Sequence, residues 1–210
     1  MKDEPELGEF KFRVNNRWID GTLNRAENPA FYGAGAGDTG RTRSHVHQID
    51  EPPVLLGEDR GANPVEYLLT GLSGCVTTTF VAYAAAQGVK TDELRTELEG
   101  VLDVRGFLGV SGRVRPGYRQ IRVRFHVKSD APREKVEELI KLAERRSPVS
   151  DSVRKGVRVD FSLVMRRALD GLEVIGTGGA PGVLGWVARA AGEPPTERIG
   201  GSKNGRETDT

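Results

Sequence analysis

The stretch NPVEYLLTGLSGCVTTTFVAYAAAQG, residues 63–88, decides the fold of this chain. Its first residues suit a helix start, because Asn63 can cap free backbone N–H groups, Pro64 fits the first helical position and Glu66 can complete a capping box. Gly88 can adopt the left-handed conformation that ends a helix. We therefore predict one long helix between Asn63 and Gly88.

This predicted helix has no charged side chain from Tyr67 to Gln87. Its length is close to the roughly 20 residues that cross a bilayer. Several Ser, Thr and Gly residues interrupt it, however, which favours the buried centre of a soluble fold over a membrane span. A helix without a polar face needs cover on all sides, and a chain this small cannot supply all of it. We therefore expect a homodimer and no membrane partner.

The amino-acid composition limits the partners and the cellular compartment that we expect. The 210 residues contain 31 Lys and Arg against 30 Asp and Glu, so no excess positive charge is present to displace counterions from nucleic acid. The single Cys excludes an intramolecular disulfide and a multi-cysteine metal site within one chain, and it fits a reducing compartment. The acidic start MKDEPELGEF lacks the apolar run of a signal peptide. We expect a cytoplasmic protein without a nucleic-acid partner.

Alternating apolar residues on both sides of the helix predict strands. Before the helix, strands are predicted at residues 9–14, 17–23 and 43–49, with a turn at Asn15-Asn16. After it, strands are predicted at 94–104, 120–128 and 157–165, and a second helix begins near Asp130 and stops at Pro148. This order indicates an α+β domain over residues 1–168. The glycine-rich residues 169–210 form a predicted tail, helical only around 181–191.

Two features of the sequence could carry chemistry. Cys75 lies inside the predicted helix, where a free Cys is most often a small buried hydrophobe, and a reactive one needs a nearby Arg or His. His45 and His47 share one face of a predicted strand, just before Asp50 and Glu51, a pattern that could bind a metal. A solvated strand face explains these residues more simply, so we expect no metal site.

The order and spacing of several segments point to one family. The predicted helix combines NPVEYLL at 63–69 with Ser-Gly-Cys at 73–75. The supporting segments are DEPPVLLGED at 50–59, LDVRGFLG at 102–109, KSDAP at 128–132 and RSPV at 146–149. Together they resemble the OsmC/Ohr family, over residues 8 to 166 of this chain.

This resemblance implies an α+β fold with two antiparallel sheets around a long buried central helix, in an intertwined homodimer. The best-known family members reduce organic hydroperoxides. They use a reactive Cys on the central helix, a second Cys in a Cys-Pro motif, and an Arg and a Glu that hold the first Cys as thiolate. These sites lie at the dimer interface, and we expect no cofactor.

Only some of the family's functional residues have a counterpart in this sequence. Cys75 matches the peroxide-attacking Cys. Trp18, Gly21 and Arg25 resemble a Trp-Gly-Arg pattern in the N-terminal strands, so Arg25 is the candidate for the Arg and Arg17 is the reserve. The loop 50–59 and a later turn are expected to shape an apolar pocket. The candidate pocket residues of that turn are Arg105, Phe107 and Leu108.

Two positions depart from the family pattern. The second Cys is replaced by Ser147, and a Ser cannot form a disulfide. The Glu position is occupied by Val65, while Glu66 lies one residue later and about 100° around the helix. Glu66 is explained equally well as the capping-box residue.

These observations leave two functions open. The first is a thiol-dependent reductase of organic hydroperoxides, in which Cys75 is oxidised and an external thiol restores it. The alternative is a dimer without catalytic activity that keeps the fold, binds a small apolar or acyl ligand, and uses Cys75 for packing.

Overall fold

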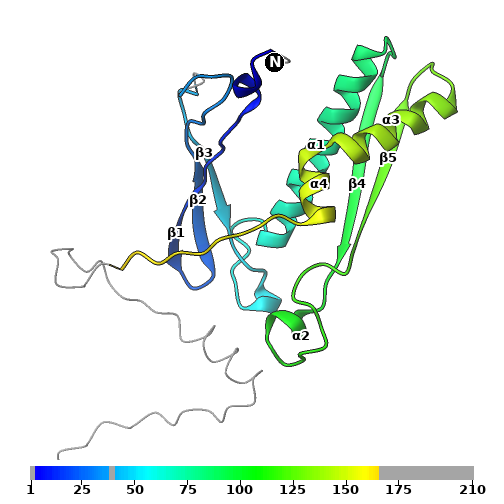
Figure 1. Ribbon diagram of the computed structural model, residues 1–210. Helices are drawn as coiled ribbons and strands as arrows, with labels where there is room; N and C mark the ends of the chain where they lie inside the picture. Colours follow the sequence, from blue (N-terminus) through cyan, green and yellow to red (C-terminus); the bar gives the residue numbers. More distant parts are fainter. Residues whose placement is uncertain (1–2, 38–40, 166–210) are drawn as a thin grey trace, which may run out of the picture.

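The computed structural model describes residues 3–37 and 41–165, and the predicted tail lies outside them. Its strands form two antiparallel sheets, one ordered β1-β2-β3 and the other β4-β5. Figure 1 shows the first sheet standing beside a body of helices and the β4-β5 pair. The elements in chain order are η1 (Pro5–Gly8), β1 (Asn15–Asp20), β2 (Leu23–Asn28), β3 (His45–Ile49), η2 (Pro53–Leu55), α1 (Pro64–Ala86), β4 (Glu93–Val101), α2 (Val104–Phe107), β5 (Gln120–Lys128), α3 (Arg133–Arg146) and α4 (Pro148–Lys155). The α+β prediction with two antiparallel sheets is confirmed.

Both ends of helix α1 follow the predicted signals. The Asn63 side chain accepts a hydrogen bond from the Val65 backbone N–H at 2.9 Å, and the Glu66 carboxylate accepts one from the Asn63 N–H at 2.9 Å. Gly88 has a φ of +68°, so the chain leaves the helix through a left-handed residue. The capping box and the glycine terminator are therefore confirmed.

Only one face of α1 is buried by its own chain. Its buried side chains recur every fourth residue: Leu72, Val76, Phe80 and Ala84. The last two form the core with Leu139 and Ala143 of α3, as the apolar stripe of the second predicted helix requires. By length and composition alone α1 could cross a membrane, a test that the core helices of soluble proteins also pass.

The first sheet differs from its predicted form. Residues 9–14 are not a strand, and the hairpin lies later, with β1 and β2 joined at Gly21 and Thr22. Gly21 has a φ of +49°, and the Asp20 side chain accepts a hydrogen bond from its N–H at 2.8 Å. The turn is thus formed by Gly21 and Thr22 rather than by Asn15-Asn16, because Gly adopts a positive φ at no steric cost.

Three further boundaries also differ. Strand β4 ends at Val101 instead of residue 104, because the Asp103 side chain caps the short helix α2 by accepting a hydrogen bond from the Arg105 N–H. Pro148 stops α3, as predicted, but it also begins a further helix, α4, that was not predicted. Residues 157–165, predicted as a strand, leave α4 as exposed chain without regular secondary structure (Figure 1).

Candidate functional site

Cys75 lies in the fourth turn of α1 and is half-buried. Cys75 lies at the edge of the buried face of α1, because the next residue, Val76, is buried and the preceding residue, Gly74, is exposed. Its backbone carbonyl accepts a hydrogen bond from the Thr79 hydroxyl at 2.7 Å. Cys75 is therefore neither a core residue nor fully in solvent, and one side of its helix remains open.

Arg25 and Arg17 lie opposite each other across the β1-β2 pair. Arg25 forms a salt bridge with Glu27, with 3.6 Å between Nε and Oε1. Helix α1 packs on β4, α3 and α4, and Figure 1 shows β2 well apart from the middle of α1. One chain therefore brings the two arginines together but does not bring either of them to Cys75.

Glu66 is held at the first turn of α1 by the capping box. At 1.5 Å per residue, its backbone lies about 13 Å along the helix axis from that of Cys75, which exceeds the reach of a carboxylate side chain. Within one chain Glu66 therefore does not reach the thiol, and its expected role beside Cys75 stays a prediction. The structure gives this residue the alternative role that the sequence analysis named, that of a helix cap.

Ser147, at the position of the family's second Cys, has no exposed surface. It is the N-cap of α4, where its Oγ accepts a hydrogen bond from the Ser150 N–H at 3.2 Å and its carbonyl accepts one from the Asp151 N–H at 2.9 Å. A capping Ser satisfies backbone donors that would otherwise be buried without partners. The sequence missed this helix, although Ser-Pro is a recognisable helix start.

The three residues expected to line a pocket lie in and just after α2, at the end of the β4-β5 hairpin. Arg105 binds the carboxylate of Asp103, and this hydrogen-bonded pair lowers the pKa of Asp103 to about 2. Phe107 is 70% exposed and Leu108 is half-buried. Within one chain these side chains border open solvent, so their pocket role stays a prediction that depends on a second chain.

Asp50 is a structural centre of the loop before α1, a role that was not predicted for it. Its carboxylate is 1% exposed and accepts hydrogen bonds from the Thr22 hydroxyl at 2.6 Å and from the backbone N–H groups of Glu51, Glu58 and Arg60. Burial by itself raises the pKa of Asp50, but these hydrogen bonds outweigh it and lower the pKa to about 2. The long loop before α1 is therefore folded around one ionised carboxylate.

The same loop joins the first sheet to the start of α1. Asn63 donates a hydrogen bond to Glu51, and the Tyr67 hydroxyl donates one to the carbonyl of Gln48 at 2.8 Å. Burial raises the pKa of Glu51, and the nearby carboxylates of Asp50 and Glu66 raise it further. The acids Asp50, Glu51 and Glu66, of which Asp50 alone is buried, thus link the first sheet to the helix.

Both histidines of the H-x-H pair have protein partners among the described residues. His47 Nε2 lies 3.0 Å from the Asn28 side-chain oxygen, and its ring meets the Tyr67 ring edge-on at 5.7 Å. His45 pairs with Asn28 across the β2-β3 ladder. Within residues 3–37 and 41–165, no group of three His, Cys, Asp or Glu side chains is placed to hold a metal ion.

Comparison with known proteins gives a family and a fold. The family model described as OsmC-like protein matches residues 57–162. An OsmC-like protein from Mycoplasma pneumoniae is similar in structure, with a TM-score of 0.54, 17% identity and coverage of 69% of this chain and 87% of that one. An OsmC-like protein of unknown function from Vibrio cholerae has a TM-score of 0.52, 13% identity and coverage of 68% and 92%. The comparison with curated proteins finds no match.

Proposed function

The chain belongs to the OsmC-like family, and from this premise we propose that it reduces organic hydroperoxides with Cys75 as its single reactive thiol. The observation that carries the proposal is the position of Cys75. The only thiol of the chain lies on the long helix inside the family match, half-buried beside an open face. A peroxide-reducing Cys needs this combination of shelter and access.

The proposed reaction has a simple balance. The Cys75 thiolate attacks the outer oxygen of the hydroperoxide, the O–O bond breaks, and the remaining alkoxide takes a proton from water and leaves as an alcohol. The sulfur loses two electrons and becomes a sulfenic acid. An external thiol then condenses with the sulfenic acid and releases water, and a second thiol reduces the mixed disulfide.

Ser147 is the reason to propose an external thiol. The buried Ser147 hydroxyl caps α4 and cannot form a disulfide with Cys75. A second molecule must therefore supply both reducing equivalents. The reducing thiols of the cytoplasm meet this requirement, so we place the reaction there.

We further propose that the working site is formed by a homodimer. Within one chain Arg25 is separated from Cys75, while one face of α1 is open and Val81 on it is 45% exposed. A second copy of the chain against that face would cover its apolar surface. It would also bring its own β1-β2-β3 sheet, with the arginines of that sheet, toward the thiol. A homodimer of this kind accounts both for the open face of α1 and for the separation of Arg25 from Cys75 within one chain.

A second candidate function is a dimer that binds a small apolar or acyl ligand without reacting with it. Two observations favour it: Ser147, at the position of the second Cys, caps α4, and Glu66, the acid next to the family's Glu position at Val65, caps α1. In this case Cys75 is a packing residue, and its replacement by Ser changes stability alone.

The deciding experiment is intact mass measurement after one equivalent of cumene hydroperoxide, without reductant. We expect the wild type to gain the mass of one oxygen atom rapidly and dimedone to trap the product, while Cys75→Ser gains nothing. A matched control places a thiol on an exposed position of α3, away from the open face of α1, as Cys75→Ser combined with Lys141→Cys. If this control reacts as fast as the wild type, or the wild type does not react, the peroxidase proposal is wrong and the second candidate remains.

A further inference from the structure

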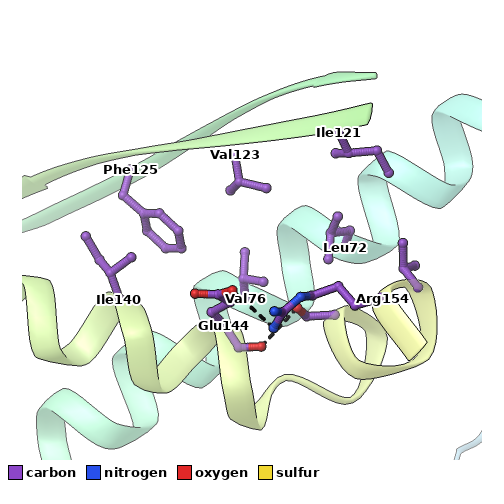
Figure 2. A pocket seen from close by; sticks show the side chains of 10 residues that line it. Leu72, Val76, Ile121, Val123, Phe125, Ile140, Glu144 and Arg154 are labelled. Carbon is purple, nitrogen blue, oxygen red and sulfur yellow. Dashed lines mark hydrogen bonds and ion pairs between the residues drawn. The ribbon is translucent and has the colours of Figure 1, made fainter. Parts of the chain in front are cut away.

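An apolar cavity lies between α1, β5, α3 and α4. Its volume is about 340 Å³. Figure 2 shows side chains from the four elements pointing toward one another around it. Its apolar walls are formed chiefly by Leu72, Val76, Val123, Phe125, Ile140 and Val153. Cys75 is not among the residues that line the cavity, so this is a different place from the proposed reaction site.

One end of the cavity carries charge. Arg154 of α4 and Glu144 of α3 line it together and form a salt bridge, with 3.1 Å between Nη1 and Oε1. A guanidinium has five N–H donors, and among the described residues Arg154 has no other ion pair. Its remaining donors can therefore bind a second acceptor without losing Glu144.

The surroundings of this end favour an anion. The last turn of α3 contains Arg145 and Arg146, and neither forms a salt bridge with a described residue. The acid nearest in the sequence, Asp151, is already paired with Lys155 of the same helix. Arg145 and Arg146 do not line the cavity, so Arg154 is the residue that would bind the anion, while apart from Glu144 and Ser150 the remaining lining is apolar.

We propose that this cavity binds a small carboxylate with an apolar body, the carboxylate on Arg154 and the body between α1 and β5. At roughly 30 Å³ for each water-sized group, the volume holds about ten such groups, the size of a medium-chain acid. Arg is suited to the head group, because its planar donors match the two oxygens of a carboxylate. This inference deepens the second candidate function, because it names the cavity and the head group, and it does not require Cys75 to react.

The test compares three probes with the same chain length and different head groups. Octanoate, octanol and octylammonium are titrated by calorimetry into the full-length protein. We expect saturable binding of octanoate, weaker binding of octanol, and none of octylammonium. Arg154→Gln should weaken octanoate about tenfold and leave octanol unchanged, whereas Arg145→Gln, the matched control outside the cavity wall, should bind octanoate as the wild type does.

A second variant tests the apolar part of the cavity. Val123→Phe places a larger side chain in the wall and should abolish binding of both octanoate and octanol, with folding checked by circular dichroism. Cys75→Ser should bind octanoate normally, which separates this inference from the peroxidase proposal. The inference is overturned if octanoate does not bind saturably, if octylammonium binds as well as octanoate, or if Arg154→Gln has no effect on octanoate.

Discussion

At the scale of single residues, Asp50 has the most defined surroundings in the described chain. Four donors converge on one carboxylate that is almost fully buried, and three of them are backbone N–H groups of its own loop. A carboxylate in this position must stay ionised to satisfy them. The sequence shows an acidic residue before two prolines but cannot show which donors fold back onto it.

This arrangement predicts an acid-sensitive stability. The pKa of Asp50 is about 2 in the folded chain and about 3.9 in an unfolded one. The ionised carboxylate therefore contributes about 2.5 kcal/mol above pH 4, and this contribution is lost as the pH falls from 4 to 2. In urea unfolding at fixed protein concentration, Asp50→Asn should lose about 2–3 kcal/mol at pH 7. Its stability should also fall less than that of the wild type below pH 4.

The matched control is Asp151→Asn, which removes an exposed carboxylate of α4. It should change the unfolding free energy by less than about 0.5 kcal/mol. Equal effects of the two substitutions at pH 7 would contradict the role assigned to Asp50.

At the scale of elements, the ends of α1 were the most predictable part of the molecule. The signals are local, since Asn63 and Glu66 lie three residues apart and Gly88 acts through its own backbone. A helix start or stop of this kind needs no partner from elsewhere in the chain. The sequence therefore located this helix to within a residue or two.

The left-handed conformation of Gly88 leads to a specific prediction. Nothing lies within 4 Å of a Cβ atom added there, so Gly88→Ala costs only backbone strain, about 1 kcal/mol. Gly112 also has open space but no positive φ, and Gly112→Ala should be close to neutral. Thermal unfolding of both variants measures the difference. A neutral Gly88→Ala would mean that the helix ends in another way.

Strands were less predictable because alternation does not identify a partner. Residues 9–14 alternate well, yet their backbone pairing with another described segment is a single bridge, between Lys11 and Tyr32. Their side chains pack on that segment instead, with the Phe12 ring tilted against the Phe31 ring at 4.9 Å between centroids. Residues 157–165 alternate too, and their apolar side chains remain exposed.

At the scale of the whole molecule, the candidate site could be predicted only residue by residue. Cys75, Arg25 and Ser147 were each placed on an element, but their separation depends on which elements pack together. Helix α1 packs with β4, α3 and α4, while the first sheet reaches it at Tyr67. No local pattern in the sequence encodes that choice.

The proposed homodimer is tested at this scale. We expect a dimer mass at micromolar concentration by light scattering. Val81→Glu, on the open face of α1, should give a monomer, because a charge there would be buried without a partner. Lys141→Glu, on an exposed position of α3, should leave the dimer intact. A monomeric wild type would contradict both the dimer and the shared site.

The exposed stretch that follows α4 also affects how the chain must be made. The backbone of residues 157–165 pairs with no strand of the described chain, and Val159, Phe161 and Leu163 stand exposed at alternate positions. Such a stretch recruits strands from neighbouring molecules, and this is how aggregates begin. During translation, the nascent chain exposes this stretch after every described helix and strand has been synthesised. We therefore expect assembly and aggregation to compete kinetically during expression. Slow synthesis at low temperature should favour assembly and raise the yield of soluble protein.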